Sequence, residues 1–140
     1  YPMQLMRSTG LQFLSLGCSG NSKLQPYFAD VLCAAEVDAL VFDSFSNPHA
    51  EMIEERLFPF IEKIQTAHPD IPLIFQLTIY REKRNFNMAE DAKEAAKQET
   101  AARNIRTYIS SRPMQQLRHT RQLLTASTLT TMATLSGLSL

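Results

Sequence analysis

The sequence LQFLSLGCSGN, residues 11–21, ends an apolar run at small residues, and ALVFDSFSNP, residues 39–48, ends a second run in the same way. Apolar residues at helical spacing follow each run, so the pattern predicts two strands, each followed by a helix. The carboxyl ends of neighbouring parallel strands line one crevice, where open α/β sheets bind their ligands. Gly20 can offer a backbone N–H there and Asn47 a side-chain amide, and two donors directed at one point form an oxyanion hole.

The rest of the chain up to residue 108 repeats the alternation of strand and helix. We expect strands at residues 11–16, 39–42 and 72–80, and helices at residues 24–35, 50–67 and 88–108. The helix at 50–67 contains Pro59, which lacks a backbone donor and is expected to kink it. This order predicts an α/β domain with a parallel sheet and right-handed crossover connections.

Composition limits the kinds of partner. The chain has 140 residues, 44% apolar and 20% charged, with zero net charge. These values are typical of one globular domain, and they suggest neither a nucleic acid nor an anionic membrane as partner. We expect no signal peptide and no membrane span, and we expect the natural N-terminus to be missing because the chain begins with Tyr1. Cys18 and Cys33 are expected to be free thiols, with no metal site.

Together these segments resemble the SGNH (GDSL-type) hydrolases, a family of esterases and lipases, over residues 1–109. Gly20 matches the glycine of the family's second block, here read as Leu-Gly-x-Ser-Gly-Asn, and Asn47 matches the asparagine of its third block. Proline-rich joints at Pro59 and Pro72 also fit. The resemblance implies a flavodoxin-like, three-layer α/β/α fold. It also implies hydrolysis of a small-molecule or carbohydrate ester without a metal or organic cofactor.

The same resemblance implies how the reaction proceeds. A serine attacks the ester carbonyl, a histidine accepts the serine proton, and an aspartate three residues before that histidine orients it. The oxyanion is held by the serine N–H, the N–H of Gly20 and the side chain of Asn47. Of these groups we find only Gly20 and Asn47, because the block that carries the serine is absent and no Asp-x-x-His block is present as written. We therefore expect this chain to be an incomplete and inactive piece of an esterase.

The segment at residues 110–140 differs from the rest of the chain. Its Thr, Ser, Leu and Ala composition is by itself typical of a flexible tail. The alternative is a frameshift, because DNA encoding residues 122–138, read one base earlier, can encode ATVDGIHPDNHGYALWA, in which Asp and His stand three apart. We interpret the tail as out of frame or disordered and unrelated to the family, with the break at residues 108–113.

Each motif also has a purely structural interpretation. Residues 19–21 alone are typical of a tight turn, and Asn47 followed by Pro48 is a good helix cap. Ser19 and Ser44 lack a Gly-x-Ser-x-Gly elbow and are not predicted nucleophiles.

The remaining polar candidates are given structural roles as well. His49 and His68 are expected to be exposed at helix ends, and His119 lies in the tail. Asp43 is expected to make a structural hydrogen bond, and residues 81–84 to form a solvated loop whose position would also allow contact with substrate.

Two other functions remain open. The chain can be a binding or scaffold module that kept the fold without the chemistry. It can also be a nucleotide- or phosphate-binding domain that uses residues 17–22, which ranks last because that loop lacks both the Gly-x-Gly-x-x-Gly pattern and a P-loop lysine.

Overall fold

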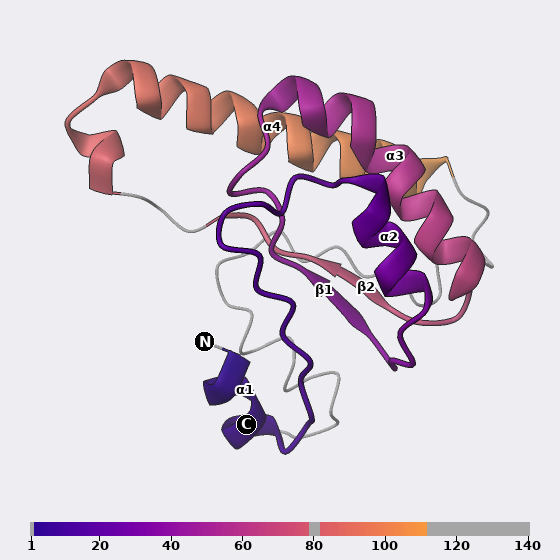
Figure 1. Ribbon diagram of the computed structural model, residues 1–140. Coiled ribbons are helices and arrows are strands. Elements are labelled where there is room, and N and C mark those ends of the chain that lie inside the picture. The colour runs from indigo at the N-terminus through magenta and orange to yellow at the C-terminus, as the bar shows by residue number, and fades with distance from the viewer. Residues whose placement is uncertain (1, 79–81, 112–140) are drawn as a thin grey trace.

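The computed structural model describes residues 2–78 and 82–111 of the chain (Figure 1). The elements follow in the order α1 (Pro2–Thr9), α2 (Pro26–Cys33), β1 (Leu40–Phe42), α3 (Ala50–Ala67), β2 (Leu73–Phe75), the short 3₁₀ helix η1 (Glu82–Asn85) and α4 (Met88–Ser110). Residues 112–140 lie outside the described residues, so the interpretation of the tail, including His119, stays a prediction.

The two strands form a parallel sheet in which Leu40 lies opposite Leu73 and Phe42 opposite Phe75. Parallel strands need a long crossover, and α3 supplies it, as the alternation of apolar patterns predicts. The fold class is therefore the expected α/β class with a parallel sheet.

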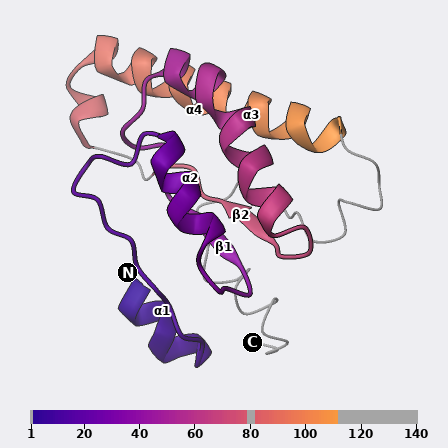
Figure 2. The same ribbon diagram turned by 45° about the vertical axis from the view of Figure 1, so that its right-hand side comes forward.

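Side chains alternate between the two faces of this small sheet. On one face Leu40, Phe42, Leu73 and Phe75 join the main core with buried residues of α2, α3 and α4. The rings of Phe42 and Phe75 stack there with centroids 5.1 Å apart. On the other face Val41 and Ile74 contact Leu5 of α1 and Phe13. Figures 1 and 2 accordingly show α1 on the far side of the sheet from α3 and α4. The result is the predicted three-layer arrangement, with one thick helical layer and one thin one.

The predicted strand at residues 11–16 was wrong. This segment is irregular, and Leu11, Leu14 and Leu16 are exposed, Leu14 to 74%. A strand must pair its backbone N–H and C=O groups along a neighbour, and packing of the single side chain of Phe13 on the sheet does not replace that pairing. Among the described residues β1 and β2 pair only with each other. The run at residues 11–16 therefore stays outside the sheet.

The bounds of the other predicted strands and helices are closer to those observed. The third predicted strand is shortened to β2, and the first large helix to Pro26–Cys33. The helix at 50–67 has its predicted bounds and continues through Pro59 as one helix. α4 begins where Asn87 accepts hydrogen bonds from the backbone N–H groups of Ala89 and Glu90, a standard N-cap. None of the helices described is long and apolar enough to cross a membrane.

Candidate active site

The loop that carries Gly20 is a tight turn. The N–H of Asn21 donates to the carbonyl of Cys18 at 2.9 Å. The two residues between them, Ser19 and Gly20, have φ values of 46° and 83°. Two consecutive left-handed residues are typical of a type I′ turn, where glycine is the residue best able to adopt the conformation. The turn predicted for residues 19–21 is therefore present, and it leaves Gly20 exposed to solvent.

Polar contacts hold the segment that follows Gly20. The side chain of Gln25 donates to the carbonyl of Asn21 at 2.7 Å and accepts the N–H of Lys23 at 2.8 Å. Arg56 of α3 donates to the carbonyl of Lys23 at 3.3 Å. These bonds tie the Gly20 loop to the start of α2 and to the side of α3.

The loop that carries Asn47 follows β1 and is anchored in the core. Phe45 and Pro48 are fully buried on either side of the half-buried Asn47. The ring of Phe45 lies 6.4 Å from that of Phe75, measured between centroids. The N-cap of α3 is His49, so the interpretation of Asn47 as a helix cap is wrong. Asn47 is left without that structural role.

The structure brings Gly20 and Asn47 together. A Cβ built on Gly20 would lie 3.8 Å from Oδ1 of Asn47. The two loops are also joined by Ser22, whose hydroxyl donates to the hydroxyl of Ser44 at 3.1 Å. In this orientation the carboxamide of Asn47 turns its oxygen toward Gly20. A half-turn of the carboxamide would present the Nδ2 donor on that side instead.

Two further segments, after β2 and in α4, contact the loop of Asn47, and neither contact was predicted from the sequence. The hydroxyls of Ser46 and Thr78 share a hydrogen bond of 2.7 Å, and Thr78 follows β2. The ammonium of Lys97 in α4 donates to the carbonyl of Ser46 at 3.1 Å. Lys97 belongs to an Ala-, Glu- and Lys-rich stretch that is typical of a solvated helix face, so no local signal singles it out.

Asp43 directly follows β1, next to these loops. No described residue hydrogen-bonds to its carboxylate, so the expected structural hydrogen bond is not formed. Asp43 is an exposed residue, but neighbouring protein atoms partly desolvate its carboxylate. This partial burial raises the pKa of the Asp43 carboxyl above its ordinary value.

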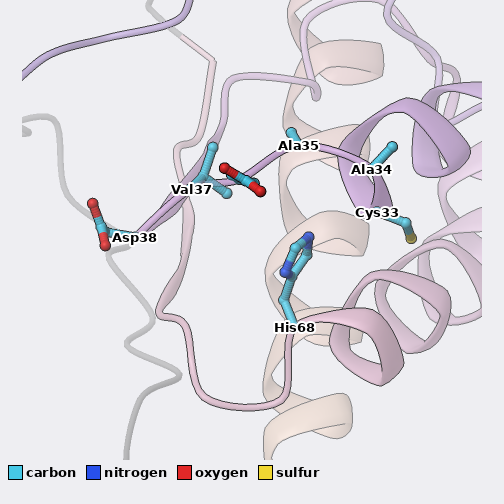
Figure 3. A pocket seen from close by; sticks show the side chains of 7 residues that line it. Cys33, Ala34, Ala35, Val37, Asp38 and His68 are labelled. Carbon is cyan, nitrogen blue, oxygen red and sulfur yellow. The ribbon is translucent and has the colours of Figure 1, made fainter.

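The histidines lie away from this place or outside the described chain. His49 is exposed, as expected, but His68 is half-buried, contrary to expectation, because its Nε2 lies 3.0 Å from the carbonyl oxygen of Leu32 at the end of α2. His68 lines an open hollow of about 450 Å³ together with residues 33–38 (Figure 3). These segments precede β1 and β2, so the hollow is at the amino end of the sheet, whereas ligands of open α/β sheets bind at the carboxyl end.

The two cysteines described are free thiols, and no group of three or more His, Cys, Asp and Glu in residues 2–78 and 82–111 is arranged to hold a metal ion. The candidate site is therefore the place where the loops of Gly20 and Asn47 meet, a polar surface site without a deep pocket of its own among the hollows described.

The structure is thus an α/β domain in which two adjacent loops carry a left-handed glycine and an asparagine. The model of the GDSL-like lipase/acylhydrolase family matches residues 1–123, and the chain belongs to that family.

A solved structure supports the same assignment. The chain is similar to a protein from Bacteroides ovatus ATCC 8483, known from a crystal structure at 1.40 Å and described as a candidate GDSL-like lipase, with 28% sequence identity and a TM-score of 0.82. The likeness covers 91% of this chain but only 37% of that one, so the chain spans well under half of the length of this relative. No curated protein matches the sequence.

Proposed function

We propose that Gly20 and Asn47 are oxyanion-hole donors of an acylhydrolase that cleaves an ester bond in a small molecule or carbohydrate. The observation that carries the proposal is their adjacency, with the Gly20 Cβ position 3.8 Å from Oδ1 of Asn47. Membership of the GDSL-like lipase/acylhydrolase family supports the general reaction.

The chemistry explains why these two groups belong together. When a serine attacks an ester carbonyl, the carbonyl oxygen becomes negatively charged and needs donors that are already in position. A backbone N–H of Gly20 and the Nδ2 of Asn47 are neutral donors fixed by their loops. Loss of one such donor typically slows turnover by about 10²–10³-fold. The nucleophile, its histidine base and the aspartate that orients this base match no residues of this sequence.

We also propose that the 140 residues alone do not hydrolyse esters. Ser44 accepts the hydroxyl hydrogen bond of Ser22, and neither it nor Ser19 is bonded to a histidine in the part of the chain described. The purified chain is expected to release p-nitrophenol from p-nitrophenyl acetate no faster than buffer does. Release that scales with protein concentration and is lost on S44A or S19A would show that a nucleophile is present after all.

The role of Asn47 is best tested in a longer gene product that supplies a Gly-x-Ser block and an Asp-x-x-His block. There N47A is expected to reduce kcat for p-nitrophenyl acetate by about 10²–10³-fold. The matched control is N87A, which removes the N-cap of α4, costs about 1 kcal/mol of stability and leaves the site untouched. Equal loss of activity in the two variants would mean that Asn47 acts only through stability.

The phosphate-binding alternative is disfavoured by the loop geometry. In phosphate sites of this class the glycine-rich turn opens directly into a helix whose N–H groups face the anion. Here α2 begins only at Pro26, which has no N–H, and residues 22–25 separate it from the turn. Sequencing the gene with its flanks distinguishes a non-catalytic scaffold from an esterase. An intact reading frame without a serine block would favour the scaffold.

A further inference from the structure

We propose that Lys97, paired with Glu94, is a positioning residue that holds the backbone of Asn47 in place. The inference rests on the proposed role of Asn47 as a donor. It concerns α4, an element that carries none of the residues assigned to the reaction. Lys97 does not reach the reacting atoms in this proposal and acts only through the peptide bond that precedes Asn47.

The first observation is the burial of Lys97. It is 7% exposed, although lysine is almost never buried unless its charge is paired. Its ammonium lies 2.6 Å from a carboxylate oxygen of Glu94 and donates to the carbonyl of Ser46 at 3.1 Å. The carboxylate balances the charge, so the second bond can be directed at a neutral backbone oxygen inside the protein.

The second observation is the identity of that oxygen. The carbonyl of Ser46 and the N–H of Asn47 belong to one planar peptide unit. A charged donor fixed to the carbonyl therefore sets the orientation of the plane from which the Asn47 Cα leaves. On the other side Pro48 is fully buried and has a fixed φ. Asn47 is held between these two anchors.

The third observation is that α4 holds two loops at once. The side chain of Ser46 bonds to Thr78 after β2, and the N–H of Thr78 donates to the side chain of Gln98 at 3.3 Å. Gln98 is the neighbour of Lys97 in sequence. Through these bonds α4 ties the end of β1 and the end of β2 together immediately beside Asn47.

The same helix contains a matched control. Lys93 and Glu90 form an ion pair with the same spacing along α4, 3.2 Å apart, but both side chains are more than half exposed. Within residues 2–78 and 82–111, the Lys93 ammonium forms its ion pair with its own helix and bonds to no loop. Exposed pairs of this kind contribute little to stability, so substitution of Lys93 tests the loss of a lysine on α4 without loss of the loop contact.

The test uses the 140-residue chain labelled with ¹⁵N and compares K97M with K93M. K97M keeps the unbranched apolar stem and removes the ammonium. We expect it to move or broaden the backbone N–H and side-chain NH₂ resonances of Asn47 by more than their line width. K93M is expected to leave both signals in place. Unmoved Asn47 signals in a folded K97M chain would overturn the proposal.

Two further variants keep the outcome interpretable. K97R restores a charged donor and is expected to bring the Asn47 signals back toward their original positions. If K97M does not fold, E94Q replaces it, because it keeps the ammonium and removes its counter-charge. E94Q should move the Asn47 signals while E90Q does not, and equal effects of the two would overturn the proposal.

A separate titration with phenylphosphonate, a tetrahedral oxyanion, tests the proposed function on its own. Movement of the Gly20 and Asn47 signals on addition of the anion supports the oxyanion hole. If the anion moves neither signal but K97M still displaces Asn47, the proposed function fails and the positioning role stands. If the anion moves these signals and K97M leaves the Asn47 signals unmoved, the proposed function stands and the positioning role of Lys97 fails.

Discussion

The run at residues 11–16 and the run at residues 39–42 are both predicted to be strands, but only the second forms one, β1. Leu40 in β1 is 7% exposed, whereas Leu14 in the earlier run is 74% exposed. β1 pairs with β2 and is covered by helices, but the earlier run pairs with no strand of the described sheet, although Phe13 packs against its face. The difference shows that an apolar segment becomes a strand through its neighbours and not through its own composition.

The loops that follow the two runs also differ in how firmly the core anchors them. The Asn47 loop is fixed by the buried side chains of Phe45 and Pro48 and by a charged bond from Lys97. The Gly20 loop is fixed by polar contacts near the surface, mainly those of Gln25 and the hydroxyl bond between the loops. The two halves of the candidate oxyanion hole are therefore held with unequal strength.

The largest effect that separates the two runs is expected from truncating one leucine in each. L40A removes a buried side chain from the core and is expected to lower the free energy of unfolding by about 2–5 kcal/mol. L14A removes an exposed side chain and is expected to change it by less than about 0.5 kcal/mol. Urea unfolding of both variants, followed by far-UV circular dichroism, measures the difference.

A large loss of stability in L14A would contradict this comparison. It would mean that the run at residues 11–16 buries its leucines in solution, as a paired strand does. Equal and small losses in both variants would instead place β1 outside the cooperative core.

A smaller effect is expected from the two glycines of the first loop. Gly20 has a φ of 83°, and G20A is expected to destabilise the chain by about 1 kcal/mol through backbone strain, because the new Cβ would meet only an ordinary contact with Asn47. Gly17 has no left-handed φ and open space around its Cβ position.

G17A is therefore the control, and it is expected to be neutral or stabilising by up to about 1 kcal/mol, since alanine reduces the entropy of the unfolded chain. In thermal unfolding the midpoint of G20A should fall, and that of G17A should stay the same or rise. A midpoint for G20A at or above that of the unmodified chain would show that Gly20 does not need its left-handed conformation.

Local patterns predicted most of what depends on local sequence. Helical periodicity located α3 with its correct bounds, and the apolar runs located both strands that pair. Gly20 and Asn47 lie in adjacent loops, as expected, although the strand predicted before Gly20 does not form, and their role in the reaction stays a prediction. The failures concern contacts between segments. Whether residues 11–16 pair depends on a neighbouring strand, and the burial of Lys97 involves a bond to a carbonyl 51 residues earlier in the chain.

The smallest expected effect lies at the end of β1, where Asp43 follows a buried strand. Partial burial raises the pKa of its carboxyl above the ordinary value of 3.8. Between the unfolded and folded pKa values the folded chain binds more protons than the unfolded chain, so stability falls as the pH rises through this window. The contribution is complete below about pH 3.8 and is lost above the folded pKa.

D43N removes this titration and is expected to flatten the pH dependence of unfolding in that window, with a neutral to slightly stabilising effect at pH 7, because the amide avoids the desolvation of a charge. Urea unfolding at closely spaced pH values in the acid range, with the unmodified chain beside D43N, measures the change. A decrease in stability of D43N at pH 7 would mean that the charged carboxylate is favoured at the end of β1. The Asn47 loop would then be held by a charge at its start as well as by Lys97.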